Sequence, residues 1–366
     1  MNEAELKDGA TSPRVMIVAP AAPPYGGMAN QAILLEKYLL KEGIRTVQVH
    51  TNRTLRSLDV FLDDLPGIRT LIREVFFLFR SLRGALRCRV IHIFACSHLY
   101  FFLHVVPCIL TGRLLRKRVI VNFRGGQAER FFKGTGKCML PVLAKSDMII
   151  VPGKFLKDIF SSLGVMVSIV PNMLEIEMYP YRPPVETDAT VFICTRNFEP
   201  YYDIPTLIKA FALVKNDLPE STLRLVGDGS QRSFIERMIT GSGLNGAVHL
   251  VGRVSPEKIP HYLNTSDIFV NSSVVDNYPN SILEAFAAGL PVITTRTGGI
   301  PQIVTHRQNG LMVAPQDYKT LAQTMVTLAT EYRQKVKLSG AGRRTAEMHS
   351  WKGLKPLLIK AYGFNK

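Results

Sequence analysis

The chain has few cysteines and no long uninterrupted apolar run. Its five cysteines are scattered and none forms a C-x-x-C pair, which is typical of reduced, structural cysteine in a cytosolic protein. The most apolar run, Leu99 to Leu110, is shorter than the ~20 residues of a spanning helix, and Pro107 interrupts it. The polar start of the chain does not resemble a signal peptide. We therefore expect a cytoplasmic protein, with residues 99–110 in a buried helix.

Acidic residues are also scarce relative to basic ones. The sequence has 45 Lys and Arg against 29 Asp and Glu, for a formal charge of +16. Residues 1–185 carry 25 − 14 = +11 of it and the remainder 20 − 15 = +5. A basic first half favours an anionic partner, such as a membrane surface or a phosphorylated acceptor. Because no zinc-type spacing or nucleic-acid motif is present, we expect no nucleic-acid partner.

The first half alternates short apolar runs with longer helical patterns. Residues 14–19, 47–50, 90–95 and 118–123 are predicted strands, and 28–41, 68–86 and 99–115 are predicted helices. This alternation predicts a parallel sheet covered on both faces, in a chain long enough for two α/β domains. Ligands of such sheets bind beyond the carboxyl ends of the strands. Two glycine-containing loops lie at such ends, one with Gly26 and Gly27 and one beginning at Arg124.

The most informative stretch runs from Ser272 to Val304. It contains a polar loop over 276–281, a predicted helix over 282–288 ended by Gly289, a predicted strand over 290–294, and then Gly298-Gly299. Asn280 or Ser281 is expected to cap the helix, whose first N–H groups form an anion site. Asp276 lies before that site. Glu284 lies one helical turn after it, within reach of a group attached to the anion, such as a ribose diol.

These residues resemble the donor-binding signature of family 4 glycosyltransferases. The signature begins with two acidic residues eight positions apart, here Asp276 and Glu284. A second segment follows, which residues 285–293 match, and then a glycine pair, here Gly298-Gly299. The family usually has Glu at the first position, where this chain has Asp276. The resemblance implies the GT-B fold, an α/β architecture of two Rossmann-like domains facing a central cleft.

The resemblance also implies roles for particular residues. Arg196 corresponds to a family arginine that grips the diphosphate, while Tyr201 or Tyr202 stands where the family has lysine, and Arg124 where it has histidine. The expected catalytic residues are Asp276, Arg196 and Arg124. The expected donor-binding residues are Gly26, Gly27, Asn197, Gly227, Arg253, Val254, Pro279, Asn280, Ser281 and Glu284. No metal site and no cofactor are expected, because the nucleotide-sugar is a co-substrate.

The expected domains are an acceptor-side unit over 1–183 and a nucleotide-sugar-binding unit over 184–349, with a helix over 350–366 packing back on the first. The implied function is a retaining, metal-independent hexosyltransferase. It would move a sugar from a nucleotide-sugar to a glycan or lipid-linked acceptor in cell-surface polysaccharide synthesis. Two alternatives remain open: a sugar-nucleotide epimerase of the same fold, and a catalytically silent GT-B protein that only binds a partner.

Arginines recur at helical spacing between residues 68 and 89. At ~100° per residue they form one stripe, and Leu71, Val75, Leu78 and Leu82 fall on the opposite side, which we expect to pack on the sheet. The stripe consists of Arg69, Arg73, Arg80, Arg83 and Arg87. One interpretation is a solvated outer face. The other is reversible docking of a peripheral protein on the inner face of the membrane.

Overall fold

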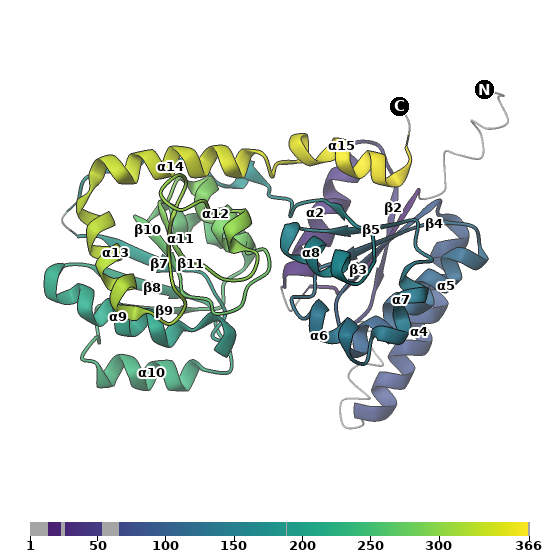
Figure 1. Cartoon of the computed structure of the whole chain (residues 1–366), viewed down its shortest axis with the longest axis horizontal. Helices are drawn as coiled ribbons and strands as arrows, with labels where there is room; N and C mark the ends of the chain where they lie inside the picture. The colour runs from purple at the N-terminus through teal and green to yellow at the C-terminus, as the bar shows by residue number, and fades with distance from the viewer. Residues whose placement is uncertain (1–13, 23–25, 53–65, 188, 365–366) are drawn as a thin grey trace. The chain divides into compact units, whose positions relative to one another are not determined.

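The computed structural model describes residues 14–22, 26–52, 66–187 and 189–364. The chain divides into two compact units (Figure 1). Residues 1–173 and 355–366 form the first, and residues 174–354 form the second. The boundaries between these units, at 173/174 and 354/355, differ from the expected boundaries, which lie at 183/184 and 349/350. Residues 174–183 pack with the second unit, since the Leu174 amide donates to the His349 carbonyl and the Arg182 amide to the Ala288 carbonyl.

The first unit contains a six-stranded parallel sheet in the order β2-β1-β3-β4-β5-β6. The predicted alternation is confirmed, and two of its strands have the predicted bounds. The strands are β1 (Val15–Ala19), β2 (Thr46–His50), β3 (Val90–Ala95), β4 (Arg118–Phe123), β5 (Met148–Val151) and β6 (Ser168–Ile169). The helices are α2 (Gly27–Lys41), α4 (Pro66–Arg87), α5 (Val106–Leu114), α6 (Ala128–Lys133), α7 (Leu140–Leu143) and α8 (Lys154–Ser162). The predicted helix over 99–115 is split, because a π-helical turn, Phe101–Val105, precedes α5.

The second unit repeats this architecture with the strand order β12-β11-β10-β7-β8-β9, again parallel. Its strands are β7 (Val191–Cys194), β8 (Thr222–Val226), β9 (Val248–Gly252), β10 (Ile268–Asn271), β11 (Val292–Thr295) and β12 (Leu311–Val313). Its helices are α9 (Ile204–Asp217), α10 (Arg232–Gly241), α11 (Ile259–Asn264), α12 (Asn280–Ala288), α13 (Tyr318–Thr330) and α14 (Tyr332–Glu347). Most strand residues are apolar, because helices cover both faces of each sheet; β2 carries the most polar residues.

The last helix, α15 (Trp351–Tyr362), begins in the second unit and ends in the first. Its end is held in the first unit by the Tyr362 hydroxyl, 2.9 Å from His92 Nδ1, and by Arg118 Nε, which donates to the Ala361 carbonyl at 2.7 Å. Lys355 Nζ forms an ion pair with Glu42 at 2.6 Å.

The orientation of α4 differs from the prediction. Leu71, Val75, Leu78 and Leu82 do not pack on the sheet, because each is 45–67 % exposed. The helix is buried instead through Phe77, Ser81, Gly84, Ala85 and Cys88. Small residues on this side allow close approach, since a Cβ on Gly84 would lie 2.5 Å from Met16 Sδ.

The arginines of α4 are not one uniformly solvated stripe. Arg83 and Arg87 are exposed, whereas Arg73 and Arg80 are half-buried. The side chain of Arg69 lies outside the described residues.

Candidate functional site

The strand order of the second unit places the predicted donor residues at one edge of its sheet. From β7, the chain continues to β8 on one side and later returns to β10 on the other. The carboxyl ends of β7 and β10 therefore form a topological switch point, where open α/β sheets bind ligands. Arg196 follows β7 and Asp276 follows β10.

Arg196 connects the loops at this switch point. Its NH2 group forms an ion pair with Asp276 Oδ2, and its NH1 group donates to Ser281 Oγ at 3.1 Å. The guanidinium also lies 3.8 Å from the ring centroid of Tyr202. Its buried Nε has no hydrogen-bond partner among the described residues. The fold thus brings three residues together around the Arg196 guanidinium, which keeps one unused hydrogen-bond donor.

The pKa values of this ion pair respond to burial and to the opposite charge. Burial lowers the pKa of Arg196, but Asp276, followed by Tyr202, shifts it upward, and the net shift is upward. Burial raises the pKa of Asp276, and Arg196 partly opposes that increase. The pair is thus a guanidinium and a carboxylate that stabilise each other at a poorly solvated position.

The loop that carries Asp276 is held by Gly298 and Gly299. The Gly299 amide donates to the Asp276 carbonyl at 2.9 Å. A Cβ on Gly298 would overlap the carbonyl oxygen of Asp276, and one on Gly299 that of Asn277. The glycine pair therefore has a structural reason, because it lets two loops touch and fixes the position of the Asp276 backbone.

The helix after this loop begins earlier than predicted. Pro279 is the N-cap residue of α12, and no side chain caps the helix. The expectation that Asn280 or Ser281 caps it is wrong, because both lie in its first turn and Ser281 Oγ accepts from Arg196. The predicted end is confirmed, since Gly289 has φ = 90° as the C-cap residue.

Glu284 lies on the second turn of α12 and is half-buried. Burial raises the pKa of its carboxyl group to about 7, although the charge of Arg196 opposes the shift. The charge of Glu284 also affects Tyr179, whose pKa is raised first by burial and then by Glu284. A carboxyl group with a pKa of about 7 thus lies near the Arg196–Asp276 pair.

The ends of β8 and β9 extend this edge. The Gly227 amide donates to the Gly252 carbonyl at 2.9 Å, which places Gly227 next to the segment of Arg253 and Val254. A Cβ on Gly227 would overlap the Arg196 carbonyl oxygen and approach Asn197 Cα to 3.3 Å. Asn197 and Arg253 are exposed and Val254 is half-buried.

Three predicted residues belong to the first unit. Gly26 is the N-cap residue of α2 with an extended backbone, and Gly27 is the first residue of that helix. Unlike Gly298 and Gly299, neither would bring a Cβ within 4 Å of another atom of the described residues. That part of the chain therefore gives no steric reason for glycine at either position.

Arg124 follows β4 in a network of buried polar groups. Its Nε donates to Asn122 Oδ1 at 3.1 Å, and its NH1 group donates to Asn172 Oδ1. Asn122 Nδ2 lies 3.1 Å from His92 Nε2, and the network continues to Tyr362. Burial lowers the pKa of Arg124 to about 9. Arg124 is therefore not a solvated loop residue but is fixed by the sheet and by the last helix.

Two contacts of this site are not predictable from the sequence. Tyr202, one of the two tyrosines at the position of the family lysine, stacks on the Arg196 guanidinium. The Tyr278 hydroxyl lies 2.7 Å from His349 Nε2, which anchors the loop of residues 276–281 to the chain after α14. No local pattern signals this contact, whose partners are 71 residues apart.

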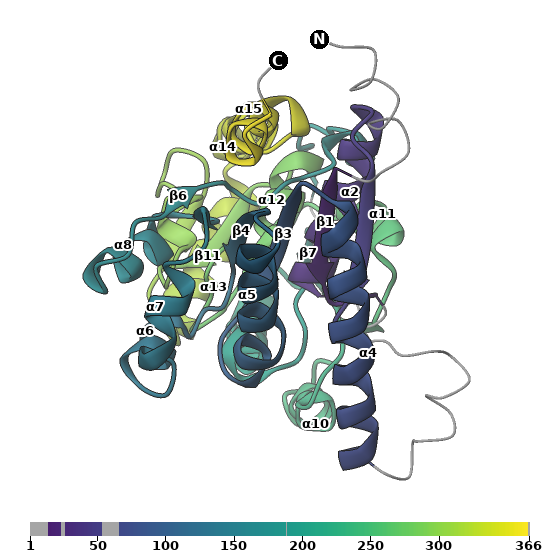
Figure 2. The ribbon, with the colours of Figure 1, turned by 90° about the vertical axis from the view of Figure 1, so that its right-hand side faces the viewer.

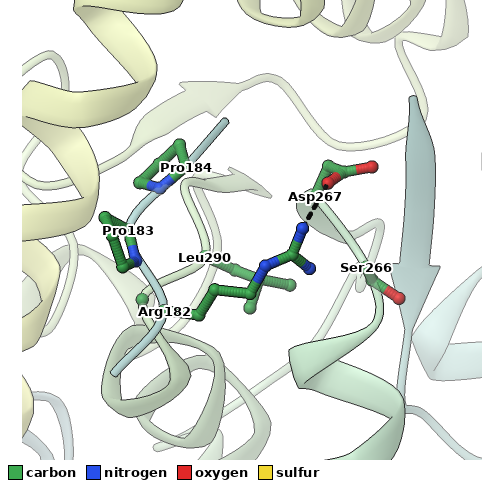
Figure 3. Close-up of a pocket in the computed structure, with 7 residues that line it drawn as sticks. Arg182, Pro183, Pro184, Ser266, Asp267 and Leu290 are labelled. Atoms are coloured by element: carbon green, nitrogen blue, oxygen red, sulfur yellow. Dashed lines mark ion pairs between the residues drawn. The ribbon is translucent and has the colours of Figure 1, made fainter. Parts of the chain in front are cut away.

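A small pocket in the second unit lies away from these residues (Figure 3). In it the Arg182 side chain points toward Asp267, with NH2 and Oδ1 3.8 Å apart. The lining residues are Arg182, Pro183, Pro184, Ser266, Asp267, Gly289 and Leu290. Because Asp267 and Leu290 precede strands β10 and β11, the pocket lies at the amino-terminal edge of the sheet. None of the predicted site residues lines it.

Metal-ligating side chains do not gather anywhere in the described part of the chain. There, no group of three or more His, Cys, Asp or Glu side chains lies together as a metal site would require. Within the same ranges, with their gaps, no helix combines the length and the apolar character needed to cross a membrane.

Comparison with known proteins identifies related sequences and folds. Residues 179–345 match the profile of the glycosyl transferases group 1. A lipopolysaccharide core biosynthesis glycosyltransferase of Rhizobium meliloti is 31 % identical over 158 residues, which cover 43 % of this chain and 45 % of that protein. A GDP-mannose-dependent mannosyltransferase of Corynebacterium glutamicum, whose named acceptor is a monoacylated phosphatidylinositol monomannoside, is 30 % identical over 174 residues, 45 % of each chain. The chain spans 23 % of the length of a similar exopolysaccharide phosphotransferase of Streptomyces coelicolor and 45 % of that of the Rhizobium meliloti protein.

The similar solved structures cover more of this chain than the similar sequences do. Anabaena HepE in complex with UDP-glucose superposes with a TM-score of 0.76 at 16 % identity, over 96 % of this chain and 99 % of that one. A sucrose-phosphate synthase from Thermosynechococcus elongatus gives a TM-score of 0.72 at 17 % identity, over 96 % and 98 %. Two parallel six-stranded units and these neighbours confirm the expected GT-B fold class.

Proposed function

We propose that this chain, whose residues 179–345 match the profile of the group 1 glycosyl transferases, transfers a sugar from a nucleotide-sugar donor to a hydroxyl-bearing acceptor. The observation that carries the proposal is the arrangement of Arg196, Asp276, Ser281 and Glu284 at the switch point of the second sheet. It combines a cation, a helix start and two carboxyl groups, which suit a diphosphate joined to a ribose and a sugar.

In this proposal each residue contacts one part of the donor. Arg196, through its unused Nε, and the first N–H groups of α12 near Asn280 and Ser281 bind the diphosphate. Glu284 accepts hydrogen bonds from the ribose hydroxyls, and Asp276 faces the hydroxyls of the donor sugar. Asn197, Gly227, Arg253 and Val254 border the nucleotide at the ends of β7, β8 and β9.

Residues of the first unit complete the proposed assignment. Glycine at positions 26 and 27 leaves open space beside the start of α2, which suits the approach of donor phosphates and of the acceptor. Arg124, in place of the family histidine, cannot serve as a base, but it can bind phosphate or a hydroxyl group. Its contacts with Asn122 and Asn172 set its direction.

The proposed reaction retains the anomeric configuration and does not require a metal ion. The bond between the anomeric carbon and the donor phosphate oxygen breaks, and the acceptor oxygen forms a bond to that carbon on the same face. The proton of the acceptor hydroxyl passes to the departing diphosphate. The protein contributes position and charge: Arg196 and the start of α12 stabilise the negative charge that develops on the leaving group.

The acceptor is proposed to be a glycan or a lipid-linked glycan in cell-surface polysaccharide synthesis. The support is the names of two relatives, one acting in lipopolysaccharide core synthesis and one on a phosphatidylinositol mannoside. We also propose that the protein is cytoplasmic and peripheral on the inner membrane face, where a basic first half favours an anionic surface.

The test begins with a donor panel. Relatives and neighbours differ in their named donors, so UDP-glucose and GDP-mannose are the first two arms. The true donor should raise the melting temperature, because ligand at 100 times its Kd adds about 2.7 kcal/mol of stability. Release of nucleoside diphosphate is then measured with and without candidate acceptors.

The outcomes separate the alternatives. Acceptor-dependent release supports transfer, and a product with the same anomeric configuration as the donor supports retention. Conversion of the donor sugar without an acceptor would identify an epimerase. Donor binding without turnover across the acceptor panel would favour a silent binding protein.

A further inference from the structure

The outer side of α4 carries an unbroken row of large apolar side chains. Each is 45–67 % exposed, although the helix belongs to a unit with a well-packed core. We call this row the α4 ridge; it consists of Leu71, Val75, Leu78, Phe79, Leu82 and Leu86. At ~100° per residue the six positions fall within about 100° of arc, and at ~1.5 Å per residue they extend over about 22 Å.

The fold does not need this ridge. The opposite side of α4 already packs in the core, with Phe77 1 %, Ser81 3 % and Ala85 0 % exposed. Soluble monomers rarely expose a large contiguous apolar patch unless it binds something. The ridge therefore indicates a contact with a partner that offers apolar surface.

The charges next to the ridge indicate what kind of partner this is. Arg83 and Arg87 are exposed on α4 and border the ridge on one side. Glu74 is the only acidic residue of the helix; it is half-buried, and its carboxylate lies 3.2 Å from His104 Nε2 on the side facing α5. Among residues 70–87 the exposed side chains are apolar or basic, apart from Thr70 at the start of the range, and none is acidic. This combination matches an anionic lipid surface.

The neighbouring helix α5 also exposes large apolar side chains. α5 packs against α4, where Ser81 Oγ and Cys108 Sγ lie 3.3 Å apart, and the two helices run side by side (Figures 1 and 2). α5 exposes Leu110 at 45 % and Leu114 at 81 %. The Arg113 side chain is also 43 % exposed. Because Arg113 forms an ion pair with Asp147 Oδ1 at 3.2 Å, α5 exposes leucines but adds no unopposed positive charge.

We infer that α4 lies in the plane of an anionic membrane surface, with its ridge inserted at the boundary between headgroups and acyl chains. Arg83 and Arg87 then bind lipid phosphates from beside the ridge. This differs from docking by an arginine stripe alone, because the apolar side chains provide a contact that salt does not screen. The inference deepens the membrane location given above and rests on that part of the proposed function, but it does not depend on sugar transfer.

Insertion is tested on the full chain with Phe79→Trp. The matched control is Met166→Trp, because Met166 is 94 % exposed in a loop of the same unit. Both proteins retain Trp351, the only native tryptophan. With vesicles of phosphatidylcholine and phosphatidylglycerol, the Phe79→Trp emission should shift to shorter wavelength and be quenched by lipids brominated on the acyl chain. Emission from Met166→Trp should change little. Equal responses of the two proteins, or none, would overturn the inference.

Two double variants separate the apolar and basic contributions in vesicle sedimentation. Leu78→Gln/Leu82→Gln should lower the partition coefficient at least tenfold in low and high salt. Its control, Leu40→Gln/Leu213→Gln, removes two leucines that are 52 % and 39 % exposed on α2 and α9, and it should bind like the wild type. Arg83→Gln/Arg87→Gln should lose about fivefold per arginine in low salt, and less in high salt.

Analytical ultracentrifugation tests whether the α4 ridge binds a second copy of this chain instead of a membrane. If the wild type forms a dimer that Leu78→Gln/Leu82→Gln abolishes, and neither protein binds vesicles, the ridge is a protein interface and the inference is wrong. A monomer that binds vesicles through the ridge supports it. Because no donor or acceptor is present in these assays, their failure would leave the transferase proposal standing.

Discussion

Arg196 and Asp276 form an ion pair between two loops that leave adjacent strands of the second sheet. Both side chains are only 10 % exposed, and the residues are 80 positions apart in the sequence. Water screens such a pair poorly, so each charge depends on the other in the absence of a ligand. A bound diphosphate would offer Arg196 a second anionic partner.

We expect Arg196→Ala to reduce kcat about 100- to 1000-fold while weakening donor affinity less than about tenfold. The reason is that charge on the leaving diphosphate increases in the transition state. Turnover assays and calorimetry with the donor give the two values. Arg237→Ala, on the exposed surface of α10, is the control and should change neither. A variant that loses only affinity would contradict the assigned role.

Stacking on Tyr202 is expected to hold the Arg196 guanidinium in place. Tyr202→Phe keeps the ring and should match the wild type, whereas Tyr202→Leu should lose about 1 kcal/mol of unfolding free energy and part of its turnover. Urea denaturation and steady-state kinetics measure both effects. If Tyr202→Phe and Tyr202→Leu have the same stability and turnover, the ring face of residue 202 does not hold the Arg196 guanidinium in place.

The raised pKa of Glu284 predicts a pH-dependent contribution to stability. The folded protein holds this proton more tightly than the unfolded chain, because the pKa rises from 4.5 to about 7. The contribution is therefore complete below about pH 4.5 and is lost as pH rises through 7. Glu284→Gln should remove this part of the pH dependence in denaturation curves. A difference between wild type and variant that stays constant across this window would contradict the shift.

The same residue should govern nucleotide affinity. If carboxylate oxygens accept hydrogen bonds from ribose, wild-type affinity should increase as pH rises through 7, and Glu284→Ala should bind nucleotide at least about tenfold more weakly with its fold intact. Calorimetry at pH 6 and pH 8 measures the effect, with circular dichroism as the control for folding. Unchanged affinity in the variant would refute the assignment.

Substitution by alanine should have different effects at Gly299 and at Gly26. Gly299→Ala should destabilise the protein by several kcal/mol or displace the loop of residues 276–281, because its Cβ would overlap the Asn277 carbonyl oxygen. Gly26→Ala has open space and should fold normally, yet it should lose donor or acceptor affinity if a ligand approaches α2. Thermal unfolding and donor titration distinguish the two. Normal affinity of Gly26→Ala would remove position 26 from the proposed site.

Local structure and the candidate residues of the donor site can be predicted from the sequence alone. Alternating apolar runs and helical patterns predicted the parallel α/β units, and β3 and β4 have the predicted bounds at both ends. Asp276 and Glu284 were recognised because the spacing along one loop and helix is a local property. The end of α12 at Gly289 was also predictable, since the left-handed conformation of a helix C-cap favours glycine.

Which side of α4 is buried depends on packing between segments that are distant in the sequence. Both sides of this helix contain apolar residues, and periodicity cannot tell a side that packs on Met16 from one that faces outward. The buried side carries Ser81, Gly84 and Ala85, and the absence of a side chain at Gly84 lets the helix backbone lie close to Met16. The stacking of Tyr202 on Arg196 and the contact of Tyr362 with His92, 270 residues away, were equally beyond sequence reasoning. Such contacts depend on where the fold brings distant segments together, and no local pattern records that.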